Sequence, residues 1–262
     1  MKAVQPQRVK KLEIMPYSKS LLNDREQLEK MRKGIDNHTC FIIKNVIDPE
    51  MIDKIKDYLK GIGLNSLPSY HFLKEGCPDF HRVNRFDERS YVQSLMHQFI
   101  FHPWNQNVFD LFEVMKEIYI LKNILGGLEP EAFLNNTPKD GHIARLSFHC
   151  YPSGGGSLKK HADPIGEHQN NVPILQMSTK GKDYTEGGLY VVGEDDEVID
   201  IDSKMEKGDV LFFNAEIIHG VEAIDPTMKL DWLSFEGRWM MLASVIKSIE
   251  NKETANAIQL ED

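Results

Sequence analysis

A histidine and an aspartate stand two residues apart in the second half of the chain. His161 and Asp163 follow a glycine-rich turn over residues 153–157. In a strand, residues i and i+2 point to the same face, so an imidazole and a carboxylate at this spacing can bind one metal ion side by side. The chain has ten histidines, so this pair indicates a metal site only when the residues around it do so as well.

A third candidate ligand follows further along the chain. The segment KGDVLFFN (207–214) has the pattern of a turn followed by an apolar strand, and His219 stands just beyond it. Two histidines and one carboxylate form a facial triad, which binds iron(II) and leaves coordination positions open. Zinc more often uses three histidines or thiolates. The sequence therefore predicts that His161, Asp163 and His219 bind iron(II).

An arginine lies within the apolar strand pattern GRWMMLASVI (237–246). Burying Arg238 there is costly unless its charge is paired. A planar guanidinium can hold a carboxylate through two parallel hydrogen bonds. We therefore expect Arg238 to grip the distal carboxylate of a co-substrate. The alternative is an internal salt bridge with a carboxylate of the protein.

The elements that must position these residues change in character near residue 140. Before it, helical spacing of apolar residues predicts helices over 21–34, from the N-cap Asp48 onward, and over 107–125. After it, short apolar or alternating segments predict strands at 142–151, 173–177, 188–192, 198–201, 210–214 and 238–246. We predict a mainly helical region over 1–140, a catalytic β core over 141–249 and a polar tail over 250–262.

The strand over 142–151 has two different faces. One face carries Leu146, Phe148 and Cys150. The other face carries Arg145, Ser147, His149 and Tyr151. We expect the polar face to turn inward, where Arg145, Ser147 and His149 contact the substrate. In the alternative interpretation these side chains only pair with their neighbours.

The composition limits the class of protein. With a net charge of −9 and a pI near 5.6, the chain is a poor candidate for a general binder of nucleic acid or anionic membranes. It has no secretory signal and no apolar run of the ~20 residues that a membrane helix needs. Its three cysteines lack C-x-x-C spacing, which favours a reducing compartment. We predict a cytoplasmic protein; the sequence gives no indication of its oligomeric state.

These residues together resemble a known family. The segment CYPSGGGSLKKHAD (150–163) is similar to the C-Y-P-x-x-G-x-x-Y-x-x-H-x-D stretch of 2-oxoglutarate oxygenases of the prolyl 4-hydroxylase type. GGLYVV (187–192), GDVLFF (208–213), His219 and Arg238 follow in the family's order. The resemblance covers residues 143–246. It implies Fe(II), with 2-oxoglutarate and O2 as co-substrates. It also implies an α+β fold, in which a double-stranded β-helix (jelly roll) core carries the N-terminal helices on one sheet.

The resemblance assigns two further positions and shows some departures. Tyr151 falls where the family uses a tyrosine to contact 2-oxoglutarate. Gln176 falls where another tyrosine helps to bind the distal carboxylate. The gap between His219 and Arg238 is longer than in the oxygen-sensing enzymes of the family, and Met240 replaces a common serine. Residues 1–140 carry no resemblance, so the substrate cannot be carried over.

The resemblance implies a hydroxylase of an unactivated C–H bond that releases succinate and CO2. Our first choice of substrate is a small molecule, such as an amino acid, a sugar acid or a natural-product intermediate. Asp163 argues against halogenation, because related halogenases have a small residue there. The alternatives are a protein hydroxylase that acts on a peptidyl side chain, and a non-catalytic jelly-roll binding module or cupin-type metal isomerase. We expect residues 63–89 and the insert over 221–237 to enclose the iron.

Overall fold

The strands form one continuous hydrogen-bonded path that curls into two layers. The computed structural model describes residues 5–66, 80–88, 90, 92–105, 108–137, 140–163, 168–247 and 258–260. The strands in this part are β1 (Lys11–Pro16), β2 (Thr39–Lys44), β3 (Phe80–Arg85), β4 (Ser94–Phe101), β5 (His142–Pro152), β6 (Gly156–Ala162), β7 (Asn171–Gln176), β8 (Gly188–Val192), β9 (Val198–Asp200), β10 (Val210–Asn214), β11 (His219–Ile224), β12 (Gly237–Lys247) and β13 (Ile258–Gln259). The helical segments are η1 (Lys19–Asn23), α1 (Arg25–Asp36), α2 (Pro49–Asn65), α3 (Leu111–Val114), α4 (Lys116–Leu125) and η3 (Asp202–Lys204).

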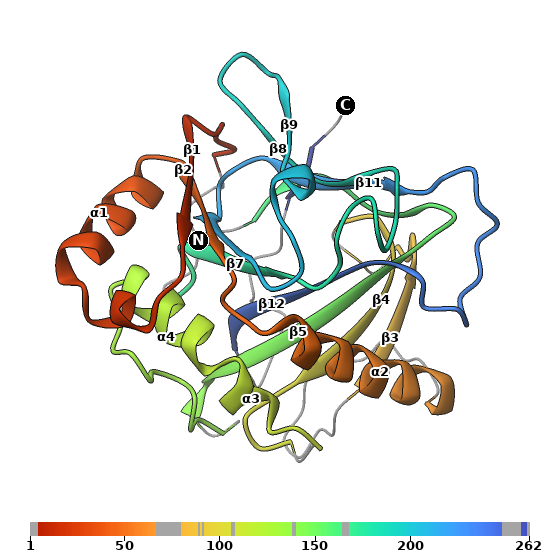
Figure 1. Ribbon diagram of the computed structural model, residues 1–262, viewed down its shortest axis with the longest axis horizontal. Helices are drawn as coiled ribbons and strands as arrows, with labels where there is room; N and C mark the ends of the chain where they lie inside the picture. Colours follow the sequence, from red (N-terminus) through yellow and green to blue (C-terminus); the bar gives the residue numbers. More distant parts are fainter. Residues whose placement is uncertain are drawn as a thin grey trace.

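The strand order is β1-β2-β10-β7-β12-β5-β4-β6-β11-β8-β9, with β3 added to β4 and β13 added to β6. Only β1 and β2 pair in parallel among these strands; the other pairs are antiparallel. The longest ladder joins β5 and β12 along their whole length. The arrangement is the expected double-stranded β-helix, and Figure 1 shows the helices along one side of β5 and β12, with β8, β9 and β11 on the other.

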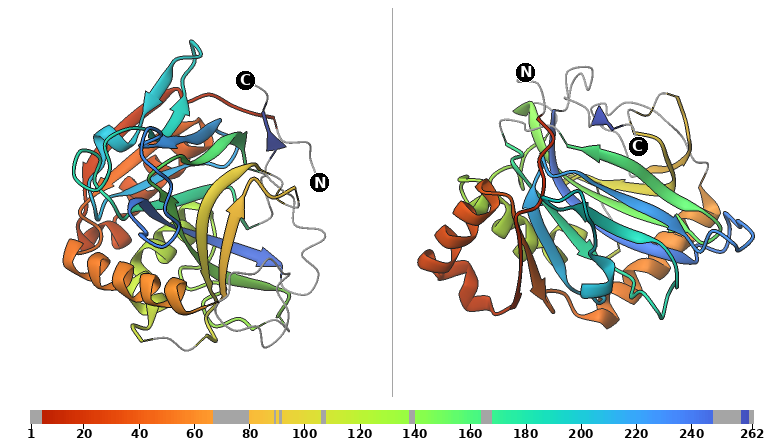
Figure 2. Two further views of the ribbon diagram at one scale, coloured as in Figure 1. Left: turned by 90° about the vertical axis from the view of Figure 1, so that its right-hand side faces the viewer. Right: turned by 90° about the horizontal axis from the view of Figure 1, so that it is seen from above.

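Alternation along the strands separates two cores. Leu146, Phe148 and Cys150 of β5 lie in the outer core together with buried residues of the helices. Tyr151 belongs instead to the inner core between the two layers of strands. The predicted split of this strand into an outer apolar face and an inner polar face is therefore confirmed. In both views of Figure 2 the helices lie outside the strands, as the sequence predicts.

Helix α2 begins where its sequence predicts. The Asp48 side chain accepts a hydrogen bond from the backbone N–H of Glu50 (3.0 Å), and Pro49 occupies the first turn. Its stripe of Ile52, Ile55 and Leu59 is fully buried. Each of these aliphatic side chains contributes about 1.5–3 kcal/mol by leaving water. This burial holds α2 against the outer face of the strands.

The other two predicted helices are shorter than expected. The segment over 21–34 divides into η1 and α1, because the Asp24 side chain caps a new helix at Gln27 N (3.0 Å). The segment over 107–125 begins only at Leu111 and breaks at Met115. Residue 107 lies outside the described residues.

We expected a mainly helical region over 1–140, and the described part of this region contains η1, α1, α2, α3 and α4. It also contributes β1 to β4, and β2 and β4 pair with β10 and β5 of the core. The segment TCFIIK of β2 is almost entirely buried. A short continuous apolar run has no periodicity that distinguishes a strand from a buried helix. Only the pairing with β10 shows that this segment is a strand.

The insert between β11 and β12 packs differently from our expectation. Phe235 packs at a tilt against Phe99 and Trp239 in an aromatic cluster on the outer face of the strands. Trp232 meets the edge of His97 on the same face. These two side chains therefore support the outer core and do not cover the inner face. Most of residues 63–89, the other segment expected to cover the iron, lies outside the described residues.

The polar tail over 250–262 is described only at residues 258–260. There the backbone adds β13 to β6, with Gln259 opposite His161. Within the described part of the chain, no helix is long and apolar enough to cross a membrane.

Candidate metal and co-substrate site

The two candidate histidine ligands are neighbours across a strand pair. His161 lies on β6 and is in register with His219, the first residue of β11. Their ring centroids are 4.2 Å apart. Asp163 follows the end of β6, where its backbone N–H bonds to the carbonyl of Ala215 (2.9 Å) in the turn before β11. The pairing of β6 with β11 therefore brings His219, which is distant in sequence, next to His161 and Asp163.

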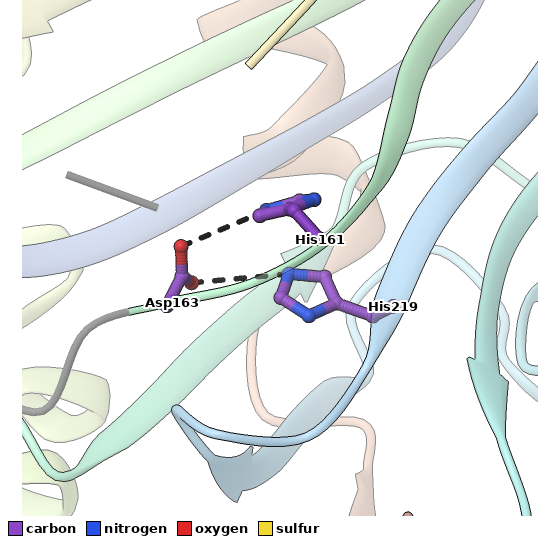
Figure 3. A group of neighbouring side chains, drawn as sticks. All are labelled: His161, Asp163 and His219. Atoms are coloured by element: carbon purple, nitrogen blue, oxygen red, sulfur yellow. Dashed lines mark ion pairs between the residues drawn. The ribbon is translucent and has the colours of Figure 1, made fainter. Parts of the chain in front are cut away.

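The three side chains converge on one point, as Figure 3 shows. His161 Nε2 is 3.6 Å from Asp163 Oδ1, and His219 Nε2 is 3.8 Å from Asp163 Oδ2. All the candidate ligand atoms lie within 4.8 Å of one another. Two ligands that share one ion at about 2.1 Å lie at most ~4.2 Å apart, so both pairings with Asp163 fit a common ion.

The hydrogen bonds of the imidazoles suit metal binding. His161 Nδ1 is 2.8 Å from the carbonyl of Lys159, and His219 Nδ1 is 2.8 Å from the carbonyl of Ile217. A carbonyl only accepts, so Nδ1 carries the proton in both rings and Nε2 keeps its lone pair for a metal. Burial, reinforced by His219, lowers the pKa of His161 to about 4 and keeps the ring neutral at pH 7.

Arg238 does not present an open fork to a ligand. Its guanidinium is fully buried, and Asp202 accepts hydrogen bonds from Nε (2.6 Å) and Nη2 (3.0 Å). Burial alone would lower the pKa of Arg238, but the adjacent Asp202 carboxylate produces a net upward shift. The internal salt bridge considered as the alternative is thus present. Binding of a co-substrate through two parallel bonds to the same fork is not available while Asp202 holds it.

The other two residues expected near the co-substrate do surround Arg238. The side-chain carbonyl of Gln176 accepts a hydrogen bond from Arg238 Nη2 (3.0 Å). The ring of Tyr151 lies 5.6 Å from the guanidinium carbon. Burial raises the pKa of Tyr151, and the negative charges of Asp202 and Asp163 act in the same direction. The roles of these residues toward a co-substrate stay predictions.

A row of inward-facing side chains crosses five strands. Through the register of the ladders, Arg82 on β3 stands beside Gln98 on β4, which is followed by His149 on β5, Met240 on β12 and Gln176 on β7. The row therefore runs from the surroundings of Arg238 to the edge strand β3. Except for Met240, its members are polar side chains.

The three residues expected to contact the substrate all lie on this inner face. Ser147 Oγ and His149 Nε2 are 2.9 Å apart, and the amide of Gln98 bonds to both (3.0 and 2.8 Å). Arg145 lies nearer the other end of β5, where its Nε donates to Ser244 Oγ (3.0 Å). These side chains thus pair with their neighbours, as the alternative interpretation holds. Their contact with a substrate stays a prediction.

Solved oxygenase structures have a similar overall arrangement. A prolyl hydroxylase of Trichoplax adhaerens, in complex with a peptide fragment of hypoxia inducible factor, superposes with a TM-score of 0.56 and 14% identity, covering 88% of this chain and 94% of that one. A Pseudomonas putida prolyl-4-hydroxylase gives 0.54 and 10%, with coverages of 85% and 100%. A full-length Neurospora crassa protein, in complex with alpha-KG and thymine, gives 0.50 and 14%, with coverages of 95% and 93%.

The chain has the double-stranded β-helix fold of these oxygenases. No family model matches the sequence, and no curated protein matches it.

Within this double-stranded β-helix, sequence reasoning missed Asp202, Gln98 and Arg82. Asp202 lies in a short helical turn with no motif around it. Gln98 lies in the segment SLMHQFIF of β4, where polar and apolar residues do not alternate, so no local pattern identifies the inner face of this strand.

Proposed function

We propose that the chain is an Fe(II)- and 2-oxoglutarate-dependent oxygenase that hydroxylates a small molecule at an unactivated C–H bond. The observation that carries this proposal is the convergence of His161, Asp163 and His219 on one point of this fold. Two imidazoles and one carboxylate form the donor set typical of non-heme iron(II), which leaves sites for other ligands. The alpha-KG bound to the Neurospora crassa protein supports the same choice of co-substrate.

His161, Asp163 and His219 would hold the iron. With 2-oxoglutarate and O2, the bound iron supplies the oxidising power that places one oxygen atom on the substrate and the other in succinate, with release of CO2. The residues of the chain bind and orient the reactants. The carbonyls of Lys159 and Ile217 keep both imidazoles in the tautomer that coordinates through Nε2.

The distal carboxylate of 2-oxoglutarate would lie beside Arg238 and Gln176, with the Tyr151 hydroxyl between this end and the metal ligands. Burial raises the pKa of Tyr151, so its hydroxyl stays protonated and can donate a hydrogen bond. The buried surroundings exclude water from the reacting groups, which strengthens these polar contacts.

The substrate would lie along the inner row toward Gln98 and Arg82. Apart from Met240, the side chains of this row are hydrogen-bond donors and acceptors on adjacent strands, which suits a compact polar molecule better than a purely apolar one. A peptidyl substrate is the second candidate, because two of the similar structures are prolyl hydroxylases and one of them holds a peptide. A binding module or a metal isomerase would form no succinate.

Succinate formation tests the proposal. Purified protein with Fe(II), ascorbate and O2 should convert 2-oxoglutarate to succinate, and panels of small polar molecules and of peptides should be compared for stimulation. His161→Ala should lose both turnover and stoichiometric metal binding. The matched control is His38→Ala, which removes a histidine in the turn between α1 and β2 and should leave both unchanged. Full activity of His161→Ala would refute the metal assignment. Stimulation by peptides alone would shift the substrate to the second candidate.

A further inference from the structure

The guanidinium of Arg238 is paired before any ligand arrives. Asp202 in η3 accepts from Nε and Nη2, and both side chains are almost completely inaccessible to water. Breaking a buried pair of this kind leaves an uncompensated charge, which strongly destabilises the fold. Asp202 therefore belongs to the permanent structure around Arg238.

The surroundings of Asp202 are built to hold its carboxylate. The Tyr184 hydroxyl donates to Oδ2 (2.5 Å), and so does the backbone N–H of Leu189 (2.8 Å). Gly188 leaves the necessary space, because a Cβ there would lie 2.5 Å from Asp202 Oδ2. Two hydrogen bonds thus fix the position of this anion independently of Arg238.

Two donors next to this pair remain unused. Arg238 Nη1 and Gln176 Nε2 are buried and have no hydrogen-bond partner in the described ranges. They are close to each other, because Gln176 Oε1 already accepts from Arg238 Nη2. A buried donor without an acceptor destabilises the ligand-free protein, so two neighbouring ones indicate a place for an acceptor from a ligand.

We propose that Asp202 is an internal counter-anion that orients Arg238 and sets the affinity for the co-substrate. It leaves Nη1 of Arg238 and the Gln176 amide as the donors for the distal carboxylate of 2-oxoglutarate. The Asp202 carboxylate also cancels much of the positive charge that the distal carboxylate of 2-oxoglutarate would otherwise meet. The two carboxylates share one guanidinium in a site that excludes water. This inference rests on the proposed function and adds to it the residue that tunes co-substrate binding.

Removal of the Asp202 charge should have two linked effects. Arg238 would lose its buried counter-charge, so the ligand-free protein becomes less stable. The distal carboxylate of 2-oxoglutarate would then be the only full negative charge on the guanidinium, and the co-substrate should bind about tenfold tighter.

Calorimetric titration of 2-oxoglutarate into the Mn(II)-loaded protein without O2 tests this inference. Asp202→Asn should lower the dissociation constant about tenfold and enlarge the rise in melting temperature that 2-oxoglutarate produces. The matched control is Asp200→Asn. It removes the same charge two residues away, where Asp200 pairs with the partly exposed Lys180, and should leave the dissociation constant unchanged. Equal or weaker binding by folded Asp202→Asn overturns the inference.

A second variant keeps the test decisive if Asp202→Asn does not fold. In Tyr184→Phe, the Asp202 carboxylate loses the hydrogen bond from the Tyr184 hydroxyl. Its negative charge then acts more strongly on Arg238, so 2-oxoglutarate should bind several-fold more weakly. Unchanged or tighter binding there also overturns the inference. A wild-type protein that neither binds 2-oxoglutarate nor forms succinate overturns the proposed function and this inference with it. Wild-type binding that the variants do not alter as stated overturns the inference alone.

Discussion

At the scale of single residues, His149 determines how the Tyr151 hydroxyl can act. Burial lowers the pKa of His149 to about 3, and the positive charges of three arginines act in the same direction, so the ring is neutral at pH 7. The amide N–H of Gln98 points at Nε2, which must therefore accept. The proton is then on Nδ1, 3.4 Å from the Tyr151 hydroxyl. Tyr151 can accept this bond and still donate its own proton to a ligand.

A double-mutant cycle should detect this link. His149→Leu and Tyr151→Phe should each raise the KM for 2-oxoglutarate several-fold, because each removes one step of the same hydrogen-bonded chain. The double variant should be little worse than the more impaired single variant, with a coupling energy of roughly 0.5–3 kcal/mol. Dissociation constants for 2-oxoglutarate, measured by calorimetry, would report the cycle without turnover. Strictly additive effects would mean that the two side chains act independently.

At the scale of elements, a buried histidine pair joins β3 to β4. His81 Nε2 and His97 Nδ1 are 2.8 Å apart, and Ser66 at the end of α2 bonds to the other nitrogen of His81 (3.2 Å). Burial lowers the pKa of His81 to about 4 and that of His97 to about 3. This contact and the aromatic rings around it tie the hairpin to the outer core.

These shifted pKa values predict that the fold is sensitive to acid. An unfolded histidine has a pKa of about 6.5, so the unfolded chain binds more protons than the folded one once the pH falls below that value. The stability contributed by the neutral pair is complete above about pH 6.5 and is lost as the pH falls toward the folded values, on the order of a few kcal/mol. Melting temperatures between pH 7.5 and pH 4.5 check this.

The control removes the pair while it keeps the other histidines. His81→Leu combined with His97→Leu should flatten the decline in melting temperature with falling pH, because both titrating rings are gone. Variant and wild-type curves that run parallel over this range would show that the acid sensitivity comes from other groups.

At the scale of the whole molecule, the proposed metal site and the proposed site for the distal carboxylate of 2-oxoglutarate belong to different layers. The metal ligands are held by β6 and β11, whereas Arg238 and Gln176 belong to β12 and β7. In the strand order these two groups are separated by β5 and β4. A ligand that contacts both ends therefore links the two layers across the inner core.

This arrangement predicts that metal and co-substrate stabilise the fold cooperatively. Mn(II) and 2-oxoglutarate together should raise the melting temperature by more than the sum of their separate effects, since the 2-oxo acid end needs the metal. A ligand at 100 times its dissociation constant contributes about 2.7 kcal/mol. Succinate lacks the 2-oxo acid end and should give little extra stabilisation with Mn(II). Equal shifts by 2-oxoglutarate with and without metal would contradict the link between the layers.

The sequence by itself determined the features that depend on neighbouring residues. The spacing of His161 and Asp163, the cap of α2 at Asp48 and the alternation along β5 are all local patterns, because strand and helix periodicity directs side chains over a few residues. The order of the family motifs placed His219 and Arg238 as further candidates. These patterns were sufficient to predict the double-stranded β-helix and the position of its candidate metal ligands.

Only the tertiary structure decided what depends on contacts between distant segments. Asp202 and Arg238 are 36 residues apart, and nothing local to either predicts their ion pair. The row from Arg82 to Gln176 exists only through the register of four ladders. In the same way β2 became a strand through its pairing with β10, and the insert joined the outer core through Phe235. Burial and pairing across the chain set these outcomes, and they are properties of the packed molecule that no local window contains.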